Sequence, residues 1–109
     1  MSLIYKILPR AEWDAAVAAG RFLGSGIDLA DGFIHFSDAG QKDETLRLHF
    51  AGKTGLVLVA VEAEALGEAL KWEPSRGGSL FPHLYGPLPV ALVVSVKDVK
   101  WSPPSPIDR

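Results

Sequence analysis

The sequence contains no cysteine among its 109 residues, and positive charge is not in excess. Without cysteine the chain can form no disulfide, no thiolate metal site and no cysteine nucleophile. Eleven lysine and arginine residues stand against thirteen acidic residues, which gives a net charge of -2. A basic surface is what holds a nucleic-acid backbone, so nucleic acids are disfavoured as partners.

Long apolar runs are also missing. The longest, at residues 56–61 (LVLVAV), has the length of a strand and not of a membrane span. The first six residues (MSLIYK) lack the apolar stretch of a secretory signal. The sequence therefore predicts no membrane partner and a cytoplasmic location.

Three familiar site patterns are absent as well. No glycine-rich phosphate fingerprint occurs, because the GSG segment at residues 24–26 is too short and precedes no strong helical pattern. No two histidines stand at the close spacing typical of metal ligands, and no nucleophile elbow surrounds a serine. We therefore predict no metal site, and a Ser-His-acid hydrolase is disfavoured.

The remaining pattern predicts short strands and two main helices. Residues 10–19 have helical spacing and end before Gly20, and Asp38 and Gln41 have the spacing of a capping box that starts a second helix. Strands are predicted at residues 3–8, 32–36, 56–62, 71–73 and 90–96, with a flexible loop at 74–79. Trp72, in the short strand 71–73, is predicted to lie in the core.

This element order predicts the α+β class, with a mixed or antiparallel sheet arrangement, because strict alternation of strand and helix is missing. The length fits one domain, which we place at residues 1–101. Residues 102–109 are rich in proline and are predicted to form a loose tail.

Two short clusters place histidine among aromatic and glycine residues. They are residues 31–37 (DGFIHFS) and 81–87 (FPHLYGP). A buried imidazole needs a hydrogen-bond partner, so two such clusters suggest one shared polar pocket.

In the first cluster, strand alternation places Phe33, His35 and Ser37 on one face and two apolar residues on the other. His35 and Ser37 would then line the pocket and bind a ligand or, for His35, act in catalysis. The alternatives are a structural His35 bonded to a neighbouring carbonyl and a Ser37 that only introduces the next helix.

In the second cluster, prolines stiffen a loop that presents His83 and Tyr85 on the same side. His83 can donate or accept a hydrogen bond, and Tyr85 can stack on a ligand and bond to it. Glu73 is a candidate catalytic carboxylate and Arg76 a candidate contact for a phosphate. Each has an alternative as an ordinary solvated or covering residue.

Taken together, these blocks resemble the small bacterial proteins grouped as domain-of-unknown-function family 952. The resemblance runs over nearly the whole chain, to about Trp101. It is carried by Ile4-Tyr5-Lys6-Ile7, Trp13, residues 32–37, Gln41, residues 56–61, Trp72-Glu73 and residues 81–87.

The resemblance implies an ADP-ribosyltransferase-like fold, in which two small sheets enclose a cleft for NAD. It implies that His35 and Ser37 contact the ribose, with Phe36 in place of the glycine of a His-Gly-Ser pattern, and that Tyr85 stacks on nicotinamide. Many such enzymes use a late glutamate, but no glutamate follows Glu73 in this sequence. Either Glu73 serves in this role, or the histidines replace it, or this reaction is absent.

Three functions stay open at this point. The first is an NAD or nucleotide site with transferase chemistry, in which His35, His83 and Glu73 are catalytic and Ser37, Tyr85 and Arg76 bind the ligand. The second is a noncatalytic module that binds a small ligand in the same pocket. The third is a structural or interaction domain with satisfied histidines. The sequence does not fix the substrate or the oligomeric state.

Overall fold

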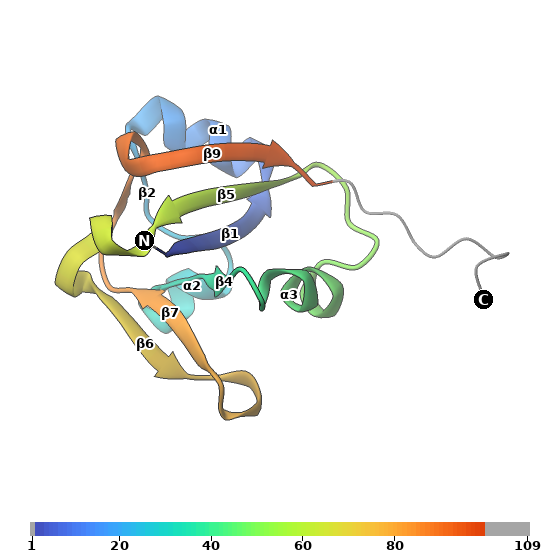
Figure 1. Cartoon of the computed structure of the whole chain (residues 1–109). Helices are drawn as coiled ribbons and strands as arrows, with labels where there is room; N and C mark the ends of the chain where they lie inside the picture. The colour runs from blue at the N-terminus through green and yellow to red at the C-terminus, as the bar shows by residue number, and fades with distance from the viewer. Residues whose placement is uncertain (1, 100–109) are drawn as a thin grey trace, which may run out of the picture.

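The computed structural model describes residues 2–99 and places a four-stranded antiparallel sheet at its centre (Figure 1). The strand order is β4-β1-β5-β9. The bounds are β1 Leu3–Pro9, β4 Ser37–Asp38, β5 Leu56–Glu62 and β9 Val93–Asp98. β1 and β5 are rich in branched aliphatic residues, which favour strands, and they pair along their whole lengths.

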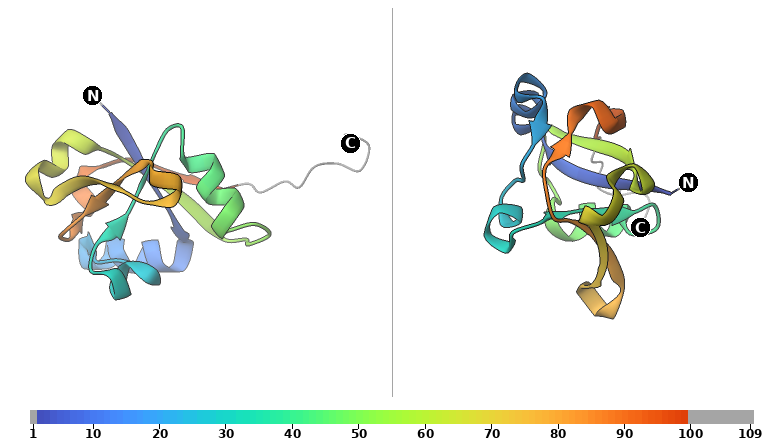
Figure 2. Two further views of the ribbon diagram at one scale, coloured as in Figure 1. Left: turned by 90° about the horizontal axis from the view of Figure 1, so that it is seen from below. Right: turned by 90° about the vertical axis from the view of Figure 1, so that its left-hand side faces the viewer.

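A second, three-stranded sheet has the order β3-β7-β6. It is formed by β3 (Ile34–His35), β6 (Leu70–Pro74) and β7 (Leu80–Leu84). β6 and β7 form an antiparallel hairpin that extends away from the four-stranded sheet (Figure 2). Within the described residues, a third ladder pairs β2 (Arg21–Phe22) with β8 (Leu88–Pro89).

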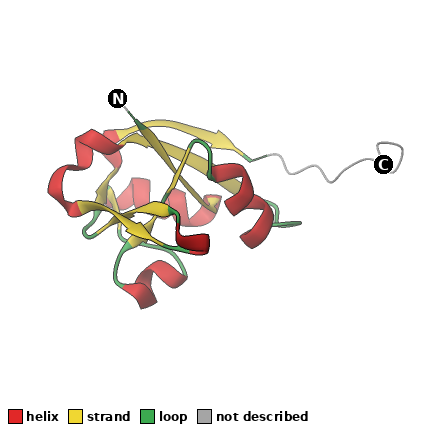
Figure 3. Cartoon of the chain, turned by 60° about the horizontal axis from the view of Figure 1, so that its bottom comes forward, coloured by secondary structure: helices red, strands yellow, loops and turns green. Residues whose placement is uncertain are grey.

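Within residues 2–99, three α-helices and three short 3₁₀ helices connect these strands (Figure 3). The α-helices are α1 (Arg10–Ala19), α2 (Ile27–Asp31) and α3 (Lys42–His49). The 3₁₀ helices are η1 (Ala63–Ala69), η2 (Arg76–Gly78) and η3 (Val90–Leu92). No helix within residues 2–99 is long and apolar enough to cross a membrane.

Local sequence signals explain both main helices. α1 ends at Gly20, whose φ of 85° is the left-handed conformation that glycine adopts without steric cost. Before α3, the Asp38 backbone N–H donates to Gln41 Oε1, and the Gln41 N–H donates to Asp38 Oδ1. This reciprocal pair is the capping box that the spacing predicts.

The core lies between the four-stranded sheet, α1 and the second sheet. Trp13 of α1 packs near Phe22 of β2, with 6.5 Å between ring centroids. The other buried core residues include Ile4, Leu8, Ile34, Phe36, Val57, Val59, Val61, Leu84 and Leu88. Burial of this apolar surface is the main driving force for the fold.

The α+β class with small antiparallel sheets is confirmed, and several details differ from the prediction. Residues 32–36 do not form one strand, because β3 and β4 pair with different sheets. The helix α2 was not predicted, residues 90–92 form η3 before β9 begins, and His83 lies in strand β7 instead of a loop. The predicted tail at 102–109 lies outside the described residues.

Trp72 is 41% exposed, so the prediction of a core position is wrong. Its strand β6 is the edge of the three-stranded sheet and runs along the hairpin that leaves the body of the protein. An edge strand that projects in this way has no second layer to bury an aromatic side chain.

Candidate functional site

Strand pairing brings the two histidine clusters together. β3 and β7 are antiparallel, and His35 stands directly opposite His83 in their register. Opposite residues on one face have neighbouring side chains, and the two imidazole centroids are 5.3 Å apart. The two clusters therefore meet in one place, although 48 residues separate them along the chain.

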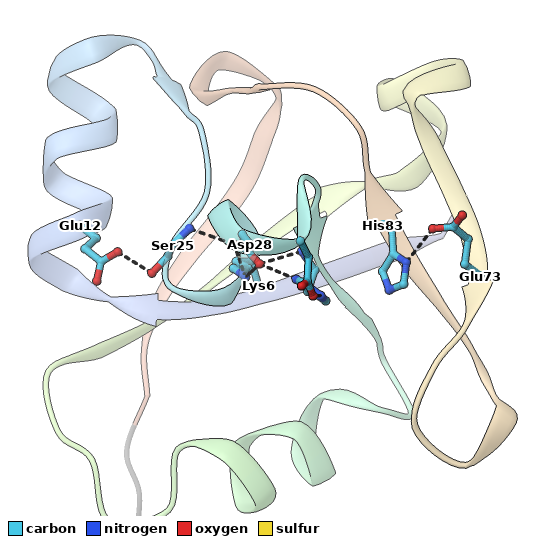
Figure 4. Close-up of polar contacts among 8 residues, drawn as sticks. Lys6, Glu12, Ser25, Asp28, Glu73 and His83 are labelled. Carbon is cyan, nitrogen blue, oxygen red and sulfur yellow. Dashed lines mark hydrogen bonds and ion pairs between the residues drawn. The ribbon is translucent and has the colours of Figure 1, made fainter.

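Asp28 of α2 organises the first group, and its side chain is almost fully buried. Lys6 Nζ lies 2.7 Å from Oδ2 and 3.0 Å from Oδ1. The backbone N–H groups of Ser25 and His35 donate to the same carboxylate at 3.0 and 3.1 Å. Figure 4 shows Asp28 between Ser25 and Lys6, with Ser25 in turn bonded to Glu12.

Burial and pairing act on this ion pair in opposite ways. Burial lowers the pKa of Lys6, although the Asp28 charge opposes the change. Burial alone would raise the pKa of Asp28, but the charge of Lys6 and the hydrogen bonds from Lys6 and His35 outweigh it. The pKa of Asp28 is therefore below its usual value, and the carboxylate stays ionised at neutral pH.

Both ring nitrogens of His35 face carboxylates. Nδ1 lies 2.6 Å from Asp28 Oδ1, and Nε2 lies 3.0 Å from Asp31 Oδ2. An ionised carboxylate only accepts hydrogen bonds, so both contacts are hydrogen bonds only when the imidazole carries both protons. His35 therefore bridges two acids, and its ring joins α2 to β3.

His83 belongs to a second group with Glu73 and Tyr85. His83 Nδ1 lies 2.8 Å from Glu73 Oε1, and the Tyr85 hydroxyl donates to the same oxygen at 2.8 Å. The hydrogen bonds from His83 and Tyr85 lower the pKa of Glu73, and the bond to Glu73 raises the pKa of Tyr85. Glu73 is therefore an ionised acceptor at neutral pH.

The other ring nitrogen of His83 differs from those of His35. Nε2 is buried and has no hydrogen-bond partner, while the side chain as a whole is only 6% exposed. A buried polar atom without a partner costs free energy and is uncommon in folded proteins. His83 is also one of the residues that line a cavity.

Phe33 connects the two groups. Its ring stacks on His83 at 4.2 Å between centroids and also contacts His35 at 4.5 Å and Tyr85 at 5.0 Å. Aromatic contacts at these distances favour defined ring orientations. Phe33 therefore fixes the positions of both imidazoles.

The cavity has a volume of about 410 Å³. Aromatic residues on its wall include Tyr5, Phe36, Phe50 and Phe81, and the polar residues include Lys6, Asp28, Asp31, His35, Ser37 and His83. An apolar lining with a few polar groups is typical of small-molecule sites. Residues 2–99 contain no group of three or more side chains arranged to hold a metal ion.

Only some of the six predicted site residues line the cavity. His35, His83 and Ser37 line the cavity, and the buried Ser37 hydroxyl lies 2.8 Å from that of Thr45. Glu73 and Tyr85 are behind His83 in its hydrogen-bonded group. The backbone of Arg76 lies in η2, and its side chain lies outside the part of the chain that the structure describes.

Sequence reasoning missed Lys6, Asp28 and Asp31. Two signals could have found them. A lysine within the apolar strand LIYKILP implies a buried partner, since an isolated ammonium is costly to bury. Ser25 and Asp28 have the Ser-x-x-Asp spacing of a capping box, and the Ser25 N–H does donate to Asp28.

Comparison with solved structures finds a close likeness. The crystal structure of protein CC0527 from Caulobacter crescentus is 62% identical, covers 92% of this chain and 88% of that chain, and has a TM-score of 0.90. The solution NMR structure of CC0527 is also 62% identical over 92% of this chain and 86% of that chain, with a TM-score of 0.83. No curated protein matches the sequence.

The family described as "Protein of unknown function (DUF952)" matches residues 7–96. This span includes β3, β6 and β7 and therefore both histidine groups. The chain belongs to the DUF952 family.

Proposed function

We propose that the cavity binds an NAD-like nucleotide and that His83 acts on it as an acid or base. The observation that carries the proposal is the buried, unpartnered Nε2 of His83, a residue that lines the cavity. A ligand atom at this position would supply the missing hydrogen bond, so ligand binding would relieve a cost of the folded state.

Size and lining support a ligand that combines a flat ring with a sugar. Small-molecule sites typically measure about 300 to 1,000 Å³, and this cavity lies in that range at about 410 Å³. The aromatic side chains of Tyr5, Phe50 and Phe81 offer surfaces for a base or nicotinamide ring. The polar side of the wall, with His35 and Ser37, would meet ribose hydroxyls.

The chemistry proposed is ADP-ribosyl transfer. The bond between the ribose C1′ and nicotinamide breaks, and a new bond forms from C1′ to a nucleophilic oxygen or nitrogen of an acceptor. Nicotinamide leaves with the electron pair of the broken bond, and the acceptor's proton moves to His83 Nε2. Glu73 holds the opposite nitrogen, which orients the imidazole for this transfer.

The roles of the other residues follow from their positions. Glu73 is a positioning residue in this proposal, because it contacts His83 and is not among the residues that line the cavity. Tyr85 supports Glu73 through its hydroxyl. The two sheets on either side of the cavity correspond in this proposal to the ADP-ribosyltransferase-like arrangement that the sequence resemblance implies.

A second candidate is a noncatalytic module that binds the same class of ligand. It is favoured by the position of Glu73, whose Oε1 accepts bonds from His83 and Tyr85 and does not face the cavity. If Glu73 is the carboxylate that the transfer requires, its place outside the cavity lining means that binding would occur without turnover.

The test is a titration of isotope-labelled protein with NAD, ADP-ribose and nicotinamide, followed by amide NMR, together with an assay for nicotinamide release. We expect localised shifts at His35, Ser37 and His83. Absence of shifts with all three ligands at millimolar concentration would overturn the nucleotide proposal.

Two variants of His83 separate binding from chemistry. His83→Phe keeps the stacking on Phe33 but removes both nitrogens, so we expect loss of binding by about tenfold or more. His83→Gln keeps an acceptor and removes proton transfer, so binding would persist while release falls by roughly 10²- to 10⁴-fold. Saturable binding without release in the unmodified protein would select the noncatalytic candidate.

A further inference from the structure

Whether Nε2 of His83 is a hydrogen-bond donor or an acceptor depends on Glu73, the partner of the other ring nitrogen. Glu73 is an ionised acceptor, so the proton on His83 Nδ1 points to Glu73 Oε1. In a neutral imidazole only one nitrogen carries a proton. The buried Nε2 is then an acceptor without a donor, and it belongs to a residue that lines the cavity.

Asp31 adds acceptors to the same wall. It lines the cavity, and its side chain is 41% exposed. One oxygen contacts His35 Nε2 at 3.0 Å. A carboxylate has about four lone-pair sites on its two oxygens, so this single contact leaves capacity for a ligand donor.

Lys6, the lysine on the cavity wall, is already paired with a carboxylate. Lys6 Nζ lies within 3.0 Å of both oxygens of Asp28, and His35 stands between Asp28 and Asp31. An anionic ligand group brought beside this network would lie near two carboxylates, and the ammonium of Lys6 is already paired with Asp28.

We infer that this site selects ligands that present a neutral N–H or O–H donor to His83 and Asp31, and that it rejects the corresponding carboxylate. The substrate class is therefore a carboxamide or sugar diol, as in the nicotinamide half of NAD. This inference rests on the proposed function and specifies which part of the nucleotide enters the cavity.

Two matched probe pairs test this selection at about pH 8. In the first pair, nicotinamide carries an amide where nicotinate carries a carboxylate. In the second pair, methyl ribofuranoside has one hydroxyl that its 2-deoxy analogue lacks. We expect nicotinamide to bind at least about tenfold more tightly than nicotinate. A preference only for the riboside would assign the donor to the sugar, and a preference only for nicotinamide would assign it to the amide.

Asp31→Asn is the informative variant, because an exposed side chain can be replaced without loss of the fold. It removes one negative charge and adds an N–H₂ donor, so the preference for nicotinamide over nicotinate would shrink by about fivefold or more. Asp43→Asn is the matched control. Asp43 is exposed on α3 and does not line the cavity, so the same charge change there would leave the preference unaltered.

The outcomes distinguish the inference from the proposal beneath it. Nicotinate binding as tightly as nicotinamide, together with no preference for the riboside over its 2-deoxy analogue, overturns the inference while the nucleotide site stands. An equal change in the Asp31 and Asp43 variants also overturns it. If no probe, NAD or ADP-ribose binds, the proposed function fails and the inference falls with it.

Discussion

Two histidines that face each other across paired strands have opposite hydrogen-bonding states. His35 has both ring nitrogens on carboxylates, those of Asp28 and Asp31. His83 has one nitrogen on Glu73 and leaves the other buried without a partner. The imidazole of His35 has both ring nitrogens occupied by contacts within the protein, and that of His83 has one nitrogen without a partner.

The difference shows that residue type and burial alone do not identify a functional histidine. Both imidazoles lie in a polar cluster with aromatic neighbours, and Phe33 contacts both. The two histidines differ in the number of carboxylates that contact their ring nitrogens, which is two for His35 and one for His83. The comparison predicts that damage to the first group will mainly affect stability, and damage to the second will mainly affect binding.

The largest expected effect is on stability, from Asp28→Asn. This change leaves Lys6 in a buried position without its counter-ion and also removes the charge beside His35. Removing one partner of a buried ion pair typically costs about 3 to 5 kcal/mol of the free energy of unfolding. Urea denaturation at neutral pH measures the loss.

Asp43→Asn serves again as the control, since its carboxylate is exposed on α3. Its effect is expected to stay within about 0.5 kcal/mol, as is usual for surface changes. A cost for Asp28→Asn of about 1 kcal/mol or less would contradict the view that the first group holds the structure together.

The sequence predicted the regular parts of this fold well. The strand at residues 56–62 coincides with β5, and the capping box before α3 forms as expected. These features depend on local patterns of apolar residues and on side chains three positions apart. The exposed Trp72 was missed because an edge position is decided by which strands pair, and the local sequence does not contain that information.

Part of the candidate site could likewise be predicted from local sequence patterns. The shared location of His35 and His83 was predicted from two similar clusters, and their register confirms that the clusters meet. The buried Asp28 was missed because it lies in a five-residue helix with a weak helical pattern. Its role depends on Lys6 and His35, which approach it from strands 22 residues before and 7 residues after it.

A smaller effect on stability is expected from acid. The pKa of Asp28 is lower in the folded state than in the unfolded state. At pH values between these two pKa values, the unfolded state therefore binds more protons. The stabilisation from Asp28 is complete above its unfolded pKa, near 3.9, and is lost as pH falls through the folded value. Urea denaturation from about pH 5 to pH 2 should show this loss, and Asp28→Asn should flatten the curve.

The flattening would be partial, since Glu73 and Glu64 also have lowered pKa values and bind protons as the pH falls, with the same effect on stability. Both are far more exposed than Asp28, and exposed groups contribute little to stability. If the curve of Asp28→Asn ran parallel to that of the unmodified protein, the acid sensitivity would come from other carboxylates.

The smallest expected change comes from Tyr85→Phe, which tests how the second group is held. The variant removes the hydroxyl that donates to Glu73 Oε1, so the pKa of Glu73 should rise toward its ordinary value. Tyr85 is exposed, and the cost in stability should therefore be about 0.5 kcal/mol or less. NMR titration of the carboxyl carbon of Glu73 measures the pKa directly.

Tyr5→Phe is the matched control, because Tyr5 lies on β1 and lines the cavity instead of contacting Glu73. An unchanged pKa in Tyr85→Phe would mean that His83 alone keeps Glu73 ionised, and the acceptor state of Nε2 would then depend on a single hydrogen bond.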